Sequence, residues 1–517
     1  MRRLPTGRLL GVAILVGWAT VVGFHVKREY FKSDAVRLAE GAAMLAAGTH
    51  FYTVLMDSVA IGFSSTRLDT MPDGFYFEDF IRLDIPAMGE LQQAVVQTRI
   101  NLSHTLSLRD FRFILNSEIG AFEASGEMTG DSTLTVRLGA DGQGQPSNVE
   151  LPSGALLDAA VPLRMAAAGA LRAGNAVSAI VFDPSSMSTR ELEIRVSAVD
   201  TMIVPDSARY DEATERWVVQ VYDTVPVWRL EQSYGSVGVS TWVDNDGMVV
   251  RAESPLGFVI QRTAYELADQ AFEASRASPR MAEGYGVLIE RTAIAANADL
   301  SDVAAAPRLA VRLLDVELEG FDLAGGRQAL RGDTLVVTRE PESVLTAGAA
   351  GYTLPYTGGG AAGEELGATP LIQAEDPRIR AAALEAVGGT TDPALAARRL
   401  TDWVYEYIDK NITLSVPSAL QVLEAAEGDC NEHTVLYVAM ARSLGLPTRT
   451  AVGLVQIDGR FYYHAWPEVW LDGDWVAVDP TLGQVPADAS HLRFLVGGLA
   501  RQVELIRLIG RLGLEVV

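Results

Sequence analysis

The 517-residue sequence contains one cysteine, Cys430, and three lysines, Lys27, Lys32 and Lys410. A single cysteine excludes an intramolecular disulfide and any zinc or iron–sulfur site built from several thiolates. Acidic residues outnumber basic residues by 66 to 42, which gives a formal net charge of −24. Because phosphate binding needs clustered Lys and Arg, this balance argues against nucleic acid as a partner. The length predicts about two to four domains.

An apolar run near the N-terminus predicts a membrane anchor. It covers residues 9–26, and its 18 residues sit at the lower limit for a helix that spans a bilayer. The end of the run, TVVGFHV, offers no small-residue cleavage site, which favours an uncleaved anchor over a signal peptide. Positive charges flank the run almost equally, and the free amino terminus tips the prediction towards an inside N-terminus. We therefore expect a single-pass protein of the inner (plasma) membrane whose main chain is extracytoplasmic, in the periplasm.

Most of the N-terminal half alternates between apolar and polar residues. The pattern is clear in LEIRVSAV at residues 192–199 and in LTVRL at 134–138, and it is typical of antiparallel strands buried on one face. WVDNDGMVV predicts a tight turn at residues 245–247 rather than a calcium loop, because the spaced ligands and closing glutamate of such a loop are missing. The alanine-rich stretch at residues 154–174 predicts a helix against this sheet. No constellation in this half suggests chemistry.

The composition changes at Pro341. The next 28 residues, 342–369, contain seven glycines and no sustained period, which is typical of an interdomain linker. Helical patterns follow, one capped by Thr391 or Asp392 and a second over residues 417–426. The predicted organisation is a membrane anchor with flanks at 1–34, a mostly antiparallel β domain with an internal helix at 35–280, a small β subdomain at 281–340, a Gly-rich linker at 341–370 and a C-terminal domain at 371–517.

Cys430 lies at the start of a predicted helix, because the apolar positions that follow have helical spacing and Gly445 ends it. The helix dipole and the free amides at this end favour an anion, so we expect a lowered thiol pKa and a thiolate populated near neutral pH. Taken alone, a lone cysteine is more often a small buried apolar residue. In the same first turn, Glu432 is expected to be solvated or to cap the helix, and His433 to line or assist a site.

The stretch FYYHAWPEVWLDGDWVAVDPT, residues 461–481, predicts a β-hairpin with residues 472–473 as its two-residue turn. Counting outward from this turn places Trp466 opposite Asp479. His464 shares the face of Trp466 and lies diagonal to Asp479, at roughly 7 to 8 Å between backbones, within reach of the two side chains. A slip of one residue would put His464 and Asp479 on opposite faces, so the pairing depends on the turn length.

These segments resemble the transglutaminase-like superfamily, which has a papain-like fold. The resemblance covers about residues 375–495, and its motifs stand here as GDC at 428–430, GLPTR at 445–449, HAW at 464–466 and WVAVDPT at 475–481.

The resemblance implies that Cys430 is a nucleophile, His464 its base and Asp479 the group that orients the base. It also implies acyl transfer through a covalent acyl-enzyme, as such a triad performs elsewhere. His433 and Trp466 are the candidate substrate-channel residues, and the backbone N–H of Cys430 is the candidate oxyanion donor. A metal site built from Cys430, His433, His464 and Asp479 is disfavoured, and neither a metal nor a cofactor is expected.

The sequence as a whole predicts an α+β protein of bacterial type, anchored in the membrane by one N-terminal transmembrane helix. A mostly antiparallel β region precedes a papain-like transglutaminase core at the C-terminus. The expected activity is that of a cysteine enzyme on a protein or peptide amide, with hydrolysis by a peptidase or amidase favoured over crosslinking. A protein-crosslinking transglutaminase and a non-catalytic partner-binding module remain the alternatives.

Overall fold

The computed structural model of the chain describes most residues from 32 onward. Residues outside the description are 1–31, 57, 88–89, 118–119, 140–145, 153–154, 185, 235–236, 255–256, 277–292, 299, 301, 412–415, 499–500, 502 and 509–510. The expected anchor at residues 9–26 therefore lies outside the described part. Within that part, no helix combines the length and the apolar character needed to cross a bilayer.

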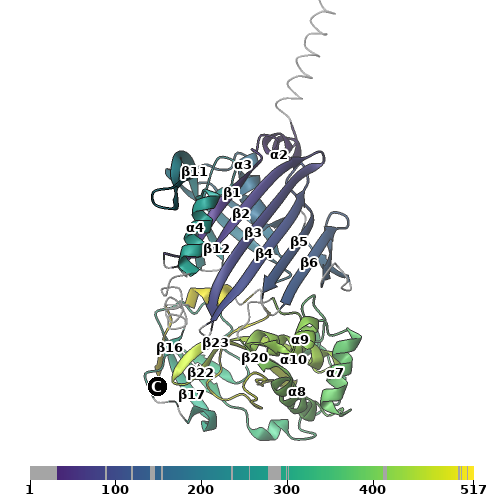
Figure 1. Cartoon of the computed structure of the whole chain (residues 1–517). Helices are drawn as coiled ribbons and strands as arrows, with labels where there is room; N and C mark the ends of the chain where they lie inside the picture. Colours follow the sequence, from purple (N-terminus) through teal and green to yellow (C-terminus); the bar gives the residue numbers. More distant parts are fainter. Residues whose placement is uncertain are drawn as a thin grey trace, which may run out of the picture.

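A sheet of 15 strands dominates the N-terminal half, in the order β8-β7-β6-β5-β4-β3-β2-β1-β15-β14-β13-β12-β11-β10-β9. Neighbouring strands are antiparallel except β9 and β10. Figure 1 shows β1 to β6 side by side as long strands above the C-terminal half. The strands are β1 (Gly48–Met56), β2 (Val59–Met71), β3 (Gly74–Ala87), β4 (Glu90–Leu102), β5 (Leu108–Ser117), β6 (Gly120–Met128), β7 (Thr133–Leu138), β8 (Ser147–Glu150), β9 (Leu156–Leu157), β10 (Ala176–Asp183), β11 (Ser188–Asp211), β12 (Arg216–Tyr234), β13 (Val237–Val243), β14 (Val249–Glu253) and β15 (Phe258–Thr263).

The alternation seen in the sequence sets the faces of these strands. In β11, Leu192, Ile194 and Val196 are buried while the residues between them are exposed, as expected for a strand with one face on a core. The predicted turn between β13 and β14 is also confirmed, because Gly247 has a φ of 79° and Asp244 accepts the backbone N–H of Met248 at 2.9 Å.

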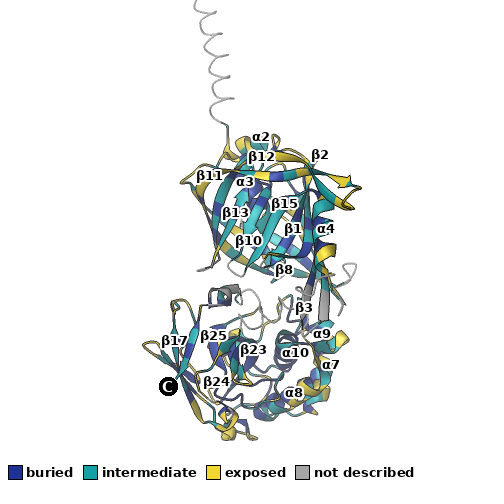
Figure 2. Ribbon diagram, turned by 60° about the vertical axis from the view of Figure 1, so that its left-hand side comes forward, coloured by how far each residue is buried: buried dark blue, intermediate teal, exposed yellow. Residues whose placement is uncertain are grey.

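A short helix fills the inside of the curled sheet. Helix α3 (Val161–Ala167) places Val161 and Met165 against apolar residues of β10 to β12, whereas Leu163 packs against residues of β2 to β7. The predicted helix at 154–174 is thus shorter than expected, with Pro162 in its first turn. Helix α4 (Tyr265–Arg276) packs on β1, β2 and β12. Helix α2 (Asp34–Ala42) instead packs on α3, and Figure 2 shows it at one end of the sheet.

The C-terminal half combines helices with small sheets. One sheet has the order β16-β23-β22-β25 with β24 paired to β23, another has the order β18-β19-β17-β26, and β20 pairs with β21 as a two-stranded sheet. The elements are β16 (Ile294–Ala295), η3 (Val303–Ala305), β17 (Arg308–Leu314), β18 (Gln328–Arg331), β19 (Thr334–Thr338), η4 (Glu342–Leu345), α6 (Gly360–Glu364), α7 (Pro377–Val387), α8 (Pro393–Tyr407), β20 (Asp409–Lys410), α9 (Ala419–Ala425), β21 (Glu427–Gly428), α10 (Cys430–Ser443), β22 (Thr448–Ile457), β23 (Arg460–Leu471), β24 (Asp474–Ala477), β25 (Leu492–Val496), η5 (Val503–Leu508) and β26 (Gly513–Val516).

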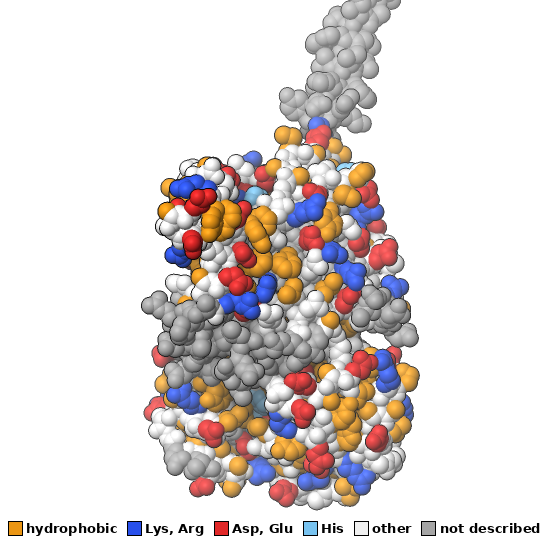
Figure 3. Space-filling model, in the orientation of Figure 1, with side chains coloured by type: hydrophobic (Ala, Val, Ile, Leu, Met, Phe, Trp, Pro, Cys, Tyr) orange, Lys and Arg blue, Asp and Glu red, His pale blue; other side chains and the backbone are white. Residues whose placement is uncertain are grey.

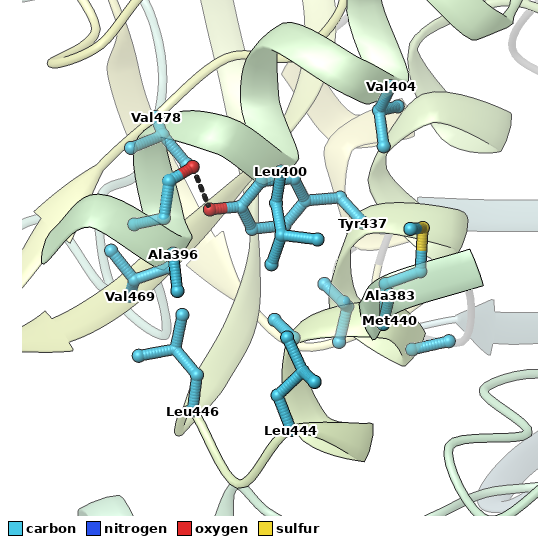
Figure 4. Packing of buried hydrophobic residues seen from close by; sticks show 14 of the residues in the cluster. Ala383, Ala396, Leu400, Val404, Tyr437, Met440, Leu444, Leu446, Val469 and Val478 are labelled. Atoms are coloured by element: carbon cyan, nitrogen blue, oxygen red, sulfur yellow. Dashed lines mark hydrogen bonds between the residues drawn. The ribbon is translucent and has the colours of Figure 1, made fainter. Parts of the chain in front are cut away.

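Helix α10 forms the centre of this half. Every residue from 432 to 441 is buried, which is the pattern of a helix surrounded by other elements rather than lying on a surface. Figure 4 shows Tyr437 of α10 among aliphatic side chains of α7, α8 and β23, with its hydroxyl donating to the carbonyl of Ala397 at 3.1 Å. The predicted helices capped at Asp392 and over 417–426 are present as α8 and α9.

The region predicted as a small β subdomain is not separate from the domain that follows. Strand β17 pairs with β26, and Val311 and Leu335 share one buried cluster with Leu454 and Phe494 of the larger sheet. Local alternation predicted the strands, but it could not reveal a partner strand some 200 residues further on.

The Gly-rich stretch also differs from the expected linker. Leu345 is buried with the core of α7, α8 and α10, and the hydroxyl of Tyr352 donates to the carbonyl of Trp470 at 2.6 Å. Backbone hydrogen bonds join Leu354 to Thr391. The stretch lacks a period because it lies against the helices as an irregular segment, and a few apolar side chains hold it there.

Candidate active site

A capping box starts α10 at the cysteine. The side chain of Asp429 accepts the backbone N–H of Asn431 at 2.8 Å, and Oε2 of Glu432 accepts the N–H of Asp429 at 2.9 Å. A Cβ atom on Gly428 would lie 2.3 Å from the Cβ of Glu432. Glycine is therefore required before Asp429 and Cys430, because any side chain at position 428 would collide with Glu432. Glu432 is buried and caps the helix.

The thiol of Cys430 lies against β23, where the backbone N–H of Ala465 hydrogen-bonds to it. Burial and the carboxylate of Asp429 raise the pKa of the Cys430 thiol well above its ordinary value. The expected lowering of this pKa was therefore wrong. The sequence-based argument counted the helix dipole but not the desolvation of the sulfur or the two carboxylates that the capping box brings beside it.

The predicted hairpin brings His464 and Asp479 together. Asp472 and Gly473 both have positive φ, 52° and 79°, and Leu471 pairs with Asp474, so the turn has two residues. Nε2 of His464 lies 2.8 Å from Oδ2 of Asp479, and both side chains are buried. The other cross-strand pair expected from this register, Trp470 and Trp475, has its ring centroids 5.2 Å apart.

Asp479 is held as a carboxylate by the groups around it. Its Oδ1 accepts the backbone N–H groups of Thr481 and Leu482 at 2.8 and 3.1 Å. Burial acts to raise the pKa of Asp479, but the charges and hydrogen bonds of His464 and His491 outweigh it and keep this pKa far below its ordinary value. The carboxylate is thus ionised and oriented at any physiological pH.

Two buried residues that the sequence did not single out complete this cluster. Nε2 of His491 lies 2.9 Å from Oδ2 of Asp479, and Nδ1 of His491 lies 3.1 Å from Oδ1 of Asp488. Burial acts to lower the pKa of His491, yet the two carboxylates raise it. The one signal in the sequence is an acid and a histidine three residues apart in ADASHL, within an irregular segment where no periodicity draws notice.

The two candidate channel residues are buried. Trp466 has no exposed surface, and its ring centroid lies 6.1 Å from that of His464 and 5.1 Å from that of His491. His433 is also fully buried, with Nδ1 2.6 Å from the carbonyl oxygen of Asp429. Trp466 does share the face of His464, but the segment that carries His491 covers that face, so Trp466 supports the imidazoles instead of facing substrate.

A cavity of about 420 Å³ lies at the start of α10. Asn431 and Thr434 of α10 line it together with Ala465, the residue whose N–H bonds to the sulfur. Its other walls come from residues 364–372, from residues 449–450 of β22, from residues 497–498 and from residues 186–188 of the N-terminal sheet domain. The cavity is therefore built by segments that are far apart in the sequence.

Arg449, the arginine of the GLPTR motif, has a structural partner. Its guanidinium bonds to Oε2 of Glu468 at 2.6 and 2.8 Å, and Arg493 reaches the same carboxylate at 3.0 and 3.1 Å. Glu468 is buried. This ion triad links β22, β23 and β25 next to the site. Removing one of its members would leave a buried charge without a partner, which is strongly destabilising.

His464, Asp479 and His491 also bring potential metal-ligating atoms within 4.8 Å of one another. The nitrogen–oxygen separations of 2.8 and 2.9 Å are those of charge-assisted hydrogen bonds. Hydrogen bonding accounts for the arrangement, and we assign no metal to it. Cys430 and His433, which completed the metal set considered from the sequence, are absent from this cluster among the described residues.

A thiol at a helix start, against a strand that carries an imidazole bound to a carboxylate, is an arrangement found in cysteine-based enzymes. Residues 380–480 match the family model of the transglutaminase-like superfamily. The C-terminal half of the chain therefore carries a transglutaminase-like domain, and the match supports a cysteine-based enzyme.

Several solved structures are similar to parts of the chain. A putative cysteine protease from Cytophaga hutchinsonii is 15% identical, covers 37% of this chain and 79% of its own, and has a TM-score of 0.26. The periplasmic domain of TgpA from Pseudomonas aeruginosa, bound to ethylmercury, is 18% identical over 35% of this chain and 74% of its own, with a TM-score of 0.23. A β-barrel-like protein of unknown function from Brucella abortus is 12% identical over 43% of this chain and 97% of its own, with a TM-score of 0.29. No curated protein matches the chain.

Proposed function

We propose that this protein is a cysteine hydrolase that forms an acyl-enzyme on Cys430 from a protein or peptide amide. The observation that carries the proposal is the hydrogen bond between Asp479 and His464, which lies on the strand that contacts the thiol. A binding module would have no need to keep a buried imidazole oriented by a carboxylate beside its single cysteine.

The raised thiol pKa favours general-base catalysis over a preformed ion pair. Nε2 of His464 donates to Asp479, which leaves Nδ1 to accept the thiol proton as the sulfur attacks the carbonyl carbon. The amide nitrogen then takes this proton and leaves, and a thioester remains on Cys430. Water, activated by the same imidazole, releases the acid and restores the thiol. The backbone N–H of Cys430, at the first position of α10, is the proposed oxyanion donor.

The cavity beside Asn431 and Ala465 is the proposed acyl-binding site. Thr434 lines it with a buried hydroxyl that has no hydrogen-bond partner among the described residues. Such a hydroxyl can bond a substrate carbonyl or amide, since a peptide offers both. In this proposal, residues 186–188 of the N-terminal domain close one side of the cleft, which gives the sheet domain a part in substrate selection.

The test is direct detection of the acyl-enzyme. An activated ester of a short peptide, incubated at pH 7.5, should add one acyl group to Cys430 by mass spectrometry. Cys430→Ala should remove the adduct, and circular dichroism should show that this variant is folded. An adduct equally present in Cys430→Ala, or none in the wild type, would contradict the proposal.

The acceptor decides between the hydrolase and the crosslinker. Adding a fluorescent primary amine at millimolar concentration offers the acyl-enzyme a choice between water and amine. We expect free acid to exceed amide product, and a reversal of this ratio would assign the protein to the crosslinkers.

Membrane anchoring is a separate proposal that rests on the apolar run at residues 9–26. A reporter that is active only outside the cytoplasm, fused after Val517, should be active and should fractionate with the inner membrane. Activity of a cytoplasmic reporter at the same position would overturn the proposed periplasmic location.

On the face shown in Figure 3, acidic and basic side chains are interspersed over both halves, so the acidic excess does not gather into one patch there.

A further inference from the structure

One oxygen of Asp479 receives two imidazoles. His464 and His491 both direct Nε2 at Oδ2, at 2.8 and 2.9 Å. The other nitrogen of His491 lies 3.1 Å from Oδ1 of Asp488. All four side chains are at most 6% exposed. The hydrogen-bonded chain thus runs from His464 through Asp479 to a second histidine and a second carboxylate.

The contacts of His491 define its protonation. A neutral imidazole has one N–H, so one of its two nitrogens would direct a lone pair at a carboxylate oxygen. The imidazolium donates from both nitrogens and satisfies both contacts. The carboxylates of Asp479 and Asp488 raise the pKa of His491 against the effect of burial. His491 is therefore a buried cation next to the carboxylate that orients His464.

We propose that His491, held by Asp488, is a positioning residue of the cysteine site that fixes the carboxylate of Asp479 and offsets its charge, so that Asp479 holds the His464 ring in the orientation that accepts the thiol proton. This inference rests on the proposed function of Cys430. It assigns His491 no contact with substrate, because His491 is fully buried behind Asp479 and the His464 ring.

The charge of Asp479 makes such an offset necessary. Oδ2 of Asp479 lies 2.8 Å from Nε2 of His464, and a buried carboxylate costs free energy unless hydrogen bonds or a cation balance its charge. A cation on the same oxygen lowers this cost. The ring of Trp466 lies against both imidazoles and excludes water, which strengthens each charge interaction in the cluster.

Other charged groups surround the cluster and belong in any account of its pH dependence. Arg327 donates a hydrogen bond to the backbone carbonyl of Asp488 at 2.9 Å. The carboxylates of Glu340 and Glu468 lie near its guanidinium. On the thiol side, the titratable groups are Cys430, Asp429, Glu432 and His433 of the α10 start. These groups are unchanged by a substitution at position 491, so a change in the pH profile reports on His491 itself.

His491→Gln is the informative variant, because glutamine keeps an N–H donor for Asp479 and removes the cation. With an activated peptide ester, loss of the cation should move the acidic limb of the kcat/KM profile to higher pH by about one unit, because the uncompensated charge of Asp479 then favours the protonated form of the site. At pH values below both limbs the rate then falls about 10-fold, whereas the high-pH plateau changes little. His104→Gln, an exposed histidine of the N-terminal domain, is the matched control and should leave the profile unchanged.

The outcomes separate the two proposals. Failure of the wild type to acylate at Cys430 would remove the proposed function itself. Normal acylation by the wild type with a superimposable or uniformly lowered His491→Gln profile would overturn the role of His491 alone. If His491→Gln does not fold, NMR of the wild type labelled at its six histidines gives the answer. His491 should be an imidazolium at pH 7, and a neutral His491 would overturn the inference.

Discussion

Glu432 accepts the backbone N–H of Asp429 at 2.9 Å, so a residue inside the first turn of α10 holds the residue that caps it. Glu432→Ala should remove this acceptor and lower the free energy of unfolding by about 0.5–2 kcal/mol, the range for loss of a helix cap. Glu432→Gln keeps an acceptor oxygen and should retain most of the stability. Urea denaturation of both variants tests this, and equal losses would show that charge rather than capping matters.

The thiol of Cys430 should lose its proton at a higher pH than an ordinary cysteine thiol. Because burial and the carboxylate of Asp429 raise its pKa, alkylation of Cys430 by iodoacetamide should be slow at pH 7 and should still be rising above pH 9. Alkylation of the urea-unfolded chain at each pH supplies the reference for an ordinary thiol. A rate that levels off at neutral pH would instead indicate the thiolate–imidazolium pair that the helix dipole alone suggests.

Asp479→Asn should leave a folded protein with a poorly oriented base. An amide can present its NH₂ group to the imidazoles, which favours the wrong tautomer of His464, and acylation should fall by a factor on the order of 10² to 10⁴. Single-turnover acylation of Cys430 is the measurement. Asp474→Asn, at the exposed first residue of β24, is the control and should acylate normally. Near-normal acylation by Asp479→Asn would remove the orienting role of this carboxylate.

The Gly-rich stretch should behave as part of the folded domain. Leu345 is 1% exposed within the core of α7, α8 and α10, so Leu345→Ala should cost about 2–5 kcal/mol of unfolding free energy. Leu384→Ala, at a position 45% exposed on α7, should change stability by about 0.5 kcal/mol or less. Limited proteolysis should spare residues 345–356 in the wild type and cut there earlier in Leu345→Ala. Rapid cleavage of this segment in the wild type would restore the linker interpretation.

The parts of the site that sequence could predict are those fixed by local rules. A two-residue turn at Asp472 and Gly473 sets the register of β23 and β24, and the period of two then places His464 beside Asp479. The start of α10 at Cys430 follows in the same way from apolar spacing and the stop at Gly445.

The parts that it could not predict depend on contacts between distant or irregular segments. His491 reaches Asp479 from an irregular segment, where neither a strand period nor a helix period specifies which way a side chain points. Leu345 is buried only because α7, α8 and α10 assemble around it. The seven glycines of residues 342–369 predicted a linker instead. The raised thiol pKa likewise required knowing that the fold buries the sulfur next to the carboxylate of Asp429.

Because β17 pairs with β26, the C-terminal half cannot complete its fold until the last strand of the chain has been synthesised. Arg312 and Glu515, which meet across these strands, are 203 residues apart. At ribosomal rates of about 5–20 residues per second, β17 emerges roughly 10 to 40 s before its partner strand. Throughout that interval one edge of β17 is open and the cluster it shares with the larger sheet is incomplete. A nascent chain stalled before residue 513 is thus the form most exposed to wrong strand pairing, and a chaperone that shields strand edges would act on it at that stage.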